Sequence, residues 1–261
     1  MQVALCQIDT VWENKAANHA KVQRFLKNTP LMPGALVVLP EMFATGFSMN
    51  VPAISDSETH ETELFLAEMA QLYGITLLGG VVTTAPDGKG QNEAVAYGPD
   101  GKEIARYCKM HPFSYGGETA YYRSGEHPIL FSCQDVEVAP FVCYDLRFPE
   151  IFRSAVRQGA ELFVVIANWP GARAAHWQTL LQARAIENQA FVVGVNRCGS
   201  DPQLTYTGGS LIIDPRGKTL FTAYDKEFLV EFTLLLEELR AYREEFPALR
   251  DIHPAYVPIE V

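Results

Sequence analysis

Three residues with reactive side chains stand at the ends of apolar, strand-like runs. Glu41 follows the run "ALVVLP", Lys109 follows "EIARYC", and Cys143 closes "VAPFVC". A loop that leaves a strand exposes its side chains against a rigid sheet, so such positions suit groups that must be held firmly and still be reached. The sequence therefore suggests one site that contains a carboxylate, an amine and a thiol.

These side-chain types match the requirements of amide hydrolysis by acyl transfer. A thiol attacks a carbonyl carbon only as the thiolate, and a free thiol with a pKa of about 8.5 needs a base or a positive neighbour to become one. Glu41 can accept that proton in an enclosed site, and Lys109 can stabilise both the thiolate and the oxyanion of a tetrahedral intermediate. The backbone N–H of Tyr144, which follows the thiol, is a second oxyanion donor.

Residue types alone do not decide the matter, because 31 acidic and 21 basic residues offer many such triples. Three segments carry more information. They are "VVLPEMFATGF", "YCKMHPF" and "FVCYDLRFPEIFR", and in this order they resemble the three signature segments of the nitrilase superfamily of carbon–nitrogen hydrolases. The resemblance implies an α/β fold, a four-layer α-β-β-α sandwich with mixed sheets, which pairs into a homodimer.

The same resemblance implies a role for each site residue. Glu41 is then the general base, Lys109 the oxyanion stabiliser and Cys143 the nucleophile. Glu118, in the loop "GGETAYYRSGE", matches the second glutamate of the family and would orient Lys109 and the base.

A longer stretch, "ANWPGARAAHWQTLLQARAIENQAFVVGVNRCGSD", resembles the omega-amidase branch of this superfamily. Bacterial members of that branch release ammonia from the terminal amide of 2-oxoglutaramate, 2-oxosuccinamate and related 2-oxo acid amides through a cysteine thioester. The alternatives within the superfamily are an amidase for deaminated glutathione, an N-carbamoyl amino acid hydrolase and a true nitrilase. From another class, the alternative is a non-catalytic dimer that binds an amide.

Arg173 is the candidate partner for a substrate carboxylate. It lies in "NWPGAR", which begins a loop before a helix, and a guanidinium group can form two parallel hydrogen bonds with a carboxylate. For Arg147 we expect a structural ion pair with Asp145 or Glu150.

Aromatic residues near the signature segments are candidates for the pocket wall, namely Phe43, Trp169, Tyr115 and Trp177. His111 and His176 are also compatible with a cysteine–histidine protease, which is a further interpretation. Histidines at such positions more often form hydrogen bonds within loops.

Composition limits the class of partner. The chain of 261 residues is 48% hydrophobic and has a formal net charge of −10, which disfavours binding to nucleic acid or to an anionic membrane. A small-molecule substrate fits better, and nothing indicates a cofactor. Its cysteines are scattered without a C-x-x-C pair, so we expect no disulfide framework or metal site and a cytoplasmic location; they are Cys6, Cys108, Cys133, Cys143 and Cys198.

Strand-like and helical patterns alternate along the chain, as in α/β proteins. Two Asp-Gly turns between residues 81 and 108 predict hairpins, which makes the sheet mixed. Phe65, Met69, Leu72 and Tyr73 are spaced as one apolar helix face. No repeat or linker divides the chain, so residues 1–261 are predicted to form a single domain.

Overall fold

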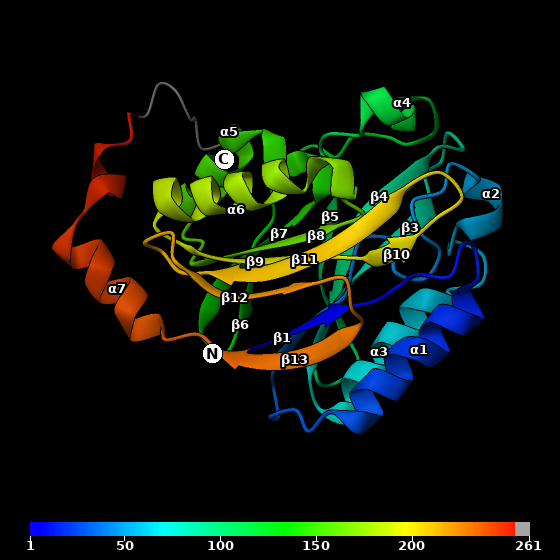
Figure 1. The fold of residues 1–261 in the computed structure, drawn as a ribbon, viewed down its shortest axis with the longest axis horizontal. Coiled ribbons are helices and arrows are strands. Elements are labelled where there is room, and N and C mark those ends of the chain that lie inside the picture. Colours follow the sequence, from blue (N-terminus) through cyan, green and yellow to red (C-terminus); the bar gives the residue numbers. More distant parts are fainter. Residues whose placement is uncertain (254–261) are drawn as a thin grey trace.

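The fold consists of two mixed β-sheets packed face to face, with helices over both outer faces (Figure 1). The structure is a computed structural model and describes residues 1–253. Helices α1 (Lys15–Asn28) and α3 (Glu61–Tyr73) cover one sheet, and α5 (Pro149–Arg157) and α6 (Ala174–Asn188) cover the other (Figure 1). The predicted four-layer α-β-β-α sandwich is confirmed.

The first sheet has the strand order β13-β1-β2-β3-β4-β5. Its centre is parallel, from β1 to β3, and its far side is the antiparallel pair of hairpins predicted from the two Asp-Gly turns. The strands are β1 (Gln2–Gln7), β2 (Leu36–Val38), β3 (Thr76–Thr84), β4 (Gly90–Tyr97), β5 (Glu103–Cys108) and β13 (Phe228–Thr233).

The second sheet has the order β10-β11-β9-β8-β7-β6, with β12 beside β11. Its centre, from β7 to β9, is also parallel. The strands are β6 (Phe131–Cys133), β7 (Val136–Val142), β8 (Leu162–Ala167), β9 (Phe191–Asn196), β10 (Cys198–Ser200), β11 (Thr205–Ile213) and β12 (Thr219–Tyr224).

Shorter elements connect these layers. Within residues 1–253, no helix has both the length and the apolar character needed to span a bilayer. The remaining helices are α2 (Val51–Ile54), α4 (Glu118–Tyr121) and α7 (Leu236–Glu245), and the 3-10 turns are η1 (Ser114–Gly116), η2 (Cys143–Arg147), η3 (Gly171–Arg173) and η4 (Ala248–Asp251).

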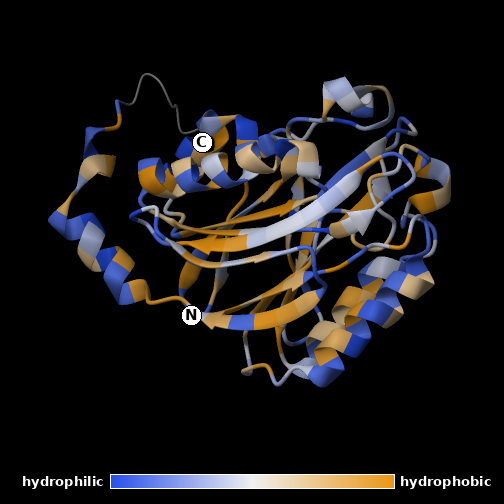
Figure 2. Ribbon diagram, in the orientation of Figure 1, coloured by the Kyte–Doolittle hydropathy of each residue, from blue (hydrophilic) through white to orange (hydrophobic). Residues whose placement is uncertain are grey.

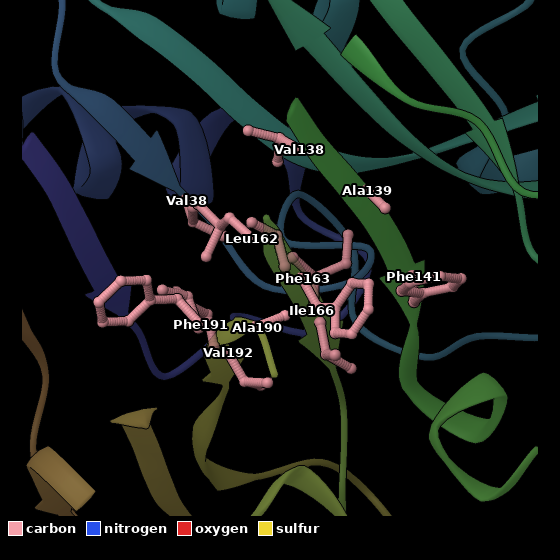
Figure 3. Packing of buried hydrophobic residues seen from close by; sticks show 14 of the residues in the cluster. Val38, Val138, Ala139, Phe141, Leu162, Phe163, Ile166, Ala190, Phe191 and Val192 are labelled. Carbon is pink, nitrogen blue, oxygen red and sulfur yellow. The ribbon is translucent and has the colours of Figure 1, made fainter. Parts of the chain in front are cut away.

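The largest cluster of buried hydrophobic residues lies between the two sheets and under α5 and α6. Figure 3 shows part of this cluster, with Val38 from the first sheet and Phe141, Phe163 and Phe191 from the second. Every residue of β8 is buried, as expected for a central parallel strand covered on both faces. Phe141 packs against Phe152 and Phe163 with ring centroids 4.0 and 5.9 Å away. Several strands of both sheets are coloured as apolar, whereas apolar and polar segments alternate along the helices (Figure 2). The central strands β7, β8 and β9 are almost wholly buried, so the second sheet is stabilised by burial on both faces.

Helix α3 corrects one detail of the predicted apolar face. Phe65 and Met69 are buried as expected, but Leu72 is 65% exposed. The buried face runs instead through Leu66 and Ala70. Leu72 lies at the margin of that face in the last helical turn, where the spacing rule alone does not separate contact with the sheet from contact with water.

Glycine at position 80 allows strand β3 to lie directly against the turn that carries Glu41. A Cβ atom on Gly80 would be 2.2 Å from the backbone nitrogen of Met42 and 2.6 Å from Cα of Glu41. The N–H of Gly80 also donates to the carbonyl of Pro40 at 3.1 Å. The position of Glu41 therefore depends on the absence of a side chain at residue 80.

We expect Gly80→Ala to lower the free energy of unfolding by about 1–3 kcal/mol or more, because the added methyl group meets backbone that cannot move aside. Urea unfolding followed by circular dichroism measures the change. Gly98→Ala is the matched control, since its nearest neighbours are side-chain atoms of Asp100 and Ile104 at 3.3 Å. Equal stability of the two variants would contradict the role of this close approach.

Candidate active site

The structure brings Glu41, Lys109 and Cys143 together from both sheets. Glu41 lies in the turn after β2, Lys109 directly follows β5, and Cys143 opens the turn η2 after β7. Lys109 Nζ is 3.0 Å from Glu41 Oε1, and the thiol of Cys143 interacts with the Glu41 side chain. Residues that are 68 and 34 positions apart in the sequence thus share one site.

Glu118 completes the charged cluster. It is the first residue of α4, and its oxygens lie 2.9 and 3.1 Å from Lys109 Nζ. The backbone N–H of Phe113 donates to the same carboxylate. Because Glu41, Lys109 and Glu118 are fully buried, the ammonium is held between two carboxylates away from water. The prediction that Glu118 orients Lys109 is consistent with these distances and stays a prediction about catalysis.

Two asparagines that the sequence analysis missed complete the hydrogen bonding of the carboxylates. Asn92 Nδ2, on β4, donates to Glu41 Oε1 at 2.7 Å and to Glu118 Oε1 at 2.9 Å. Asn168 follows β8, and its backbone N–H donates to Glu41 Oε2 at 2.8 Å. Its amide group also donates to the Glu41 carbonyl at 2.7 Å. The donors to Glu41 come from Asn92 in β4, from Lys109 after β5 and from Asn168 after β8, so the carboxylate has little freedom to turn.

Burial and charge set the protonation of the cluster. Desolvation disfavours the charged form of Lys109, but Glu118 and Glu41 outweigh it, and the pKa of Lys109 is raised well above its usual value. Burial also raises the pKa of the Cys143 thiol well above its usual value; Glu41 raises it further, and Lys109 lowers it. At neutral pH the site therefore holds an ammonium ion and a neutral thiol whose proton can pass to Glu41.

A pocket lies beside the charged cluster, and Cys143 is one of the residues that line it. Predicted residues Trp169 and Arg173 line it, and so does Tyr144, whose N–H belongs to the first turn of η2, where N–H groups have no partner within the helix. The other lining residues are Phe47, Phe113, Cys143, Arg147, Asn168, Pro170, Leu204 and Tyr206.

Three of the predicted aromatic pocket residues, Phe43, Tyr115 and Trp177, do not line the pocket. Phe43 is fully buried in the core between the first sheet and its helices, with its ring centroid 6.3 Å from that of Phe65. The intervening Met42 has a φ of 43°, so the chain turns sharply after Glu41 and directs the next side chain inward. Tyr115 is 87% exposed, and its ring centroid lies 5.9 Å from that of Phe113. Phe113, and not Tyr115, lines the pocket. Trp177 is buried in the core, with Nε1 donating to the Gly209 carbonyl at 2.8 Å.

Arg147 also differs from expectation. The predicted ion pair with Asp145 or Glu150 is wrong. Among residues 1–253, the Arg147 guanidinium pairs with no carboxylate; its Nη2 lies 3.1 Å from His176 Nδ1, and it stacks 4.9 Å from the centre of the Trp169 ring. Arg147 therefore adds a positive charge to the pocket wall.

The histidines do not form a cysteine–histidine pair. His111 Nδ1 lies 2.9 Å from Asp145 Oδ1, and its ring stacks on Phe148, while His176 faces Arg147. Within residues 1–253, no cluster of three or more His, Cys, Asp or Glu side chains is arranged to hold a metal ion. The arrangement suits covalent catalysis by a thiol, in which a carboxylate moves the proton and a fixed cation stabilises negative charge.

Comparison with known proteins agrees with this geometry. Residues 2–244 match the family model for carbon-nitrogen hydrolases. The chain is 39% identical to an omega-amidase YafV from Yersinia enterocolitica and 32% identical to a 2-oxoglutaramate amidase from Bacillus subtilis, with 96% of each chain covered in both cases. A crystal structure of XC1258 from Xanthomonas campestris, a CN-hydrolase superfamily protein with an arsenic adduct in its active site, has a TM-score of 0.90 at 34% identity and covers 97% of both chains. The predicted family is confirmed, and this chain belongs to the carbon–nitrogen hydrolases of the nitrilase superfamily.

Proposed function

We propose that this hydrolase is an omega-amidase that releases ammonia from short 2-oxo acid amides such as 2-oxoglutaramate. The observation that carries the substrate class is the presence of two arginines, Arg147 and Arg173, among the residues that line the pocket beside Cys143. Neither forms an ion pair with a carboxylate of residues 1–253, so both are available to an anionic ligand. The names of the relatives from Yersinia enterocolitica and Bacillus subtilis support the same class.

In the proposed first step, Cys143 Sγ attacks the amide carbon while its proton passes to Glu41. Lys109 and the N–H of Tyr144 stabilise the oxyanion of the tetrahedral intermediate. Glu41 then gives the proton to the departing nitrogen, the C–N bond breaks, and ammonia leaves behind a thioester on Cys143. Because the resting thiol is neutral, its proton has to pass to Glu41 before the sulfur attacks or as it does so.

In the second step, Glu41 takes a proton from water, and the hydroxide attacks the thioester carbon. The C–S bond breaks, the sulfur recovers the proton from Glu41, and the carboxylic acid product leaves. Glu118 touches Lys109 and acts by holding the ammonium toward the oxyanion. The homodimer, the single domain and the cytoplasmic location expected from the sequence stay predictions, and we propose them together with this activity.

A substrate panel and one variant test the activity. We expect faster ammonia release from 2-oxoglutaramate than from deaminated glutathione, carbamoyl-β-alanine or a simple nitrile, and loss of all turnover in Cys143→Ala, because the thioester cannot form. Cys133→Ala, which removes a buried thiol outside the pocket, is the control and should retain turnover. An active Cys143→Ala enzyme would reject the nucleophile, and preference for another substrate would reject only the omega-amidase assignment.

Glu41→Gln separates proton transfer from thiol ionisation. Burial raises the pKa of Cys143 and Glu41 raises it further, so neutralisation of Glu41 should lower that pKa and let the thiolate appear at lower pH in an ultraviolet titration. Ammonia release should nevertheless fall by about 10²- to 10⁴-fold, because no group can move the proton. Glu63→Gln, at a buried glutamate paired with Arg106, is the control. A variant with more thiolate and undiminished turnover would contradict the proposed base.

Arg173→Met and Arg147→Met test recognition of the substrate carboxylate. Each should raise KM for 2-oxoglutaramate by about 10- to 100-fold, since a charge-assisted hydrogen bond contributes about 1.5–3 kcal/mol, and should leave KM for an uncharged short amide nearly unchanged. Arg216→Met is the matched control at an exposed ion pair with Glu245. An equal loss with charged and uncharged amides would indicate a damaged pocket and no carboxylate subsite.

A further inference from the structure

The nucleophile sits in a backbone conformation that its neighbours must enforce. Cys143 has a φ of 50°, a left-handed conformation that costs a non-glycine residue about 1–3 kcal/mol and persists only when the surroundings hold it. Its turn η2 is tied at the far end by Arg184, whose Nη2 donates to the Leu146 carbonyl at 2.7 Å. Some further group has to fix the end at which Cys143 itself lies.

Asp145, two residues after the nucleophile, is that group. Its carboxylate is fully buried. Oδ2 accepts from the backbone N–H of Val142 at 3.1 Å and from the hydroxyl of Tyr107 at 2.8 Å. Oδ1 accepts from the backbone N–H of His111 at 2.9 Å and lies 2.9 Å from Nδ1 of the same residue. Since a carboxylate oxygen only accepts, the ring nitrogen of His111 has to be the donor.

These four bonds join the two reactive segments of the site. Val142 immediately precedes Cys143, whereas Tyr107 and His111 lie two residues before and two residues after Lys109. One buried carboxylate is therefore hydrogen-bonded to residues on both sides of Lys109 and to the end of the strand that precedes Cys143. Asp145 is not among the residues that line the pocket, and the hydrogen-bond partners of its carboxylate are Tyr107, His111 and Val142, so it acts on the reacting groups only through these neighbours.

We propose that Asp145 is a positioning residue, which sets the distance and direction between the Cys143 thiol and the Lys109 ammonium. The inference rests on the proposed roles of those two residues. Asparagine has the same shape but presents one acceptor oxygen and an amide group that is itself a donor. Asp145→Asn therefore leaves at least one of the opposing N–H or O–H donors without an acceptor, and the left-handed turn loses part of its support.

The test compares Asp145→Asn with Asp56→Asn. Asp56 is a matched control because its buried carboxylate also accepts backbone N–H groups, from Thr62 at 2.9 Å and Glu63 at 3.0 Å, and binds Lys15. Both variants should lose stability. Only Asp145→Asn should lower kcat, on the order of 100-fold with little change in KM, because a displacement of about 1 Å at the reacting groups has this effect.

The rate at which iodoacetamide alkylates Cys143, measured by mass spectrometry, is a second readout that needs no substrate. It should fall in Asp145→Asn and stay unchanged in Asp56→Asn. If 2-oxoglutaramate proves not to be a substrate, this rate still decides the role of Asp145 separately from the proposed function. Unchanged kcat and alkylation in a folded Asp145→Asn protein would overturn the inference, and so would equal losses in Asp56→Asn.

Tyr107→Phe is the second variant for this test, in case Asp145→Asn does not fold. It removes one donor to the carboxylate and keeps the buried ring, which packs edge-on against Phe141 with centroids 5.7 Å apart. We expect a smaller but measurable fall in kcat and in alkylation of Cys143. A folded Tyr107→Phe protein with both rates unchanged would overturn the positioning role.

Discussion

The arrangement depends on one electrostatic constraint, which is an ammonium ion buried between two carboxylates. Removal of charges from water costs several kcal/mol for each ion, and only close, well-directed partners offset that cost. Lys109 provides one positive charge to Glu41 and Glu118 at distances of 2.9–3.1 Å. Two carboxylates against one ammonium leave one negative charge in excess. Asn92 compensates part of it, because both hydrogens of its amide group point at these carboxylates.

The same constraint explains why the site lies where the two sheets meet. Each buried carboxylate needs donors from more than one direction, which a single loop does not supply here. Strands from both sheets supply them, since β4 brings Asn92 to one oxygen of Glu41 and the end of β8 brings Asn168 to the other. Gly80 lets β3 approach the Glu41 turn closely enough for this enclosure. Burial raises the pKa of the Cys143 thiol, and the charges of Glu41 and Glu118 raise it further, so the thiol is protonated at neutral pH.

Local patterns in the sequence predicted the alternation of strands and helices, whereas the four layers and the shared site of Glu41, Lys109 and Cys143 were implied by the resemblance to the nitrilase superfamily. Central strands are continuous apolar runs, and Glu41, Lys109 and Cys143 follow such runs directly. Asn92 leaves no comparable signal, because a polar residue within a strand faces either water or a buried partner, and the partners here are 51 and 26 residues away. The error at Phe43 has a similar origin. One left-handed residue, Met42, reverses the direction of the next side chain, and nothing in its residue type announces that conformation.

The error at Arg147 shows how the pocket differs from the buried cluster of Glu41, Lys109 and Glu118. Nearby carboxylates in the sequence suggested a local ion pair, but Asp145 is fully occupied by four donors from β5, β7 and the loop after Lys109. Arg147 therefore turns to the pocket and stacks on Trp169. The indole N–H of Trp169 in turn donates to the Arg173 carbonyl at 2.8 Å, so one tryptophan positions the segments that carry both guanidinium groups. The proposed reacting groups are fixed by buried charge, whereas the two arginines proposed to bind the substrate are positioned by an aromatic wall. Changes in that wall can alter the preferred amide while the chemistry of Cys143 stays the same.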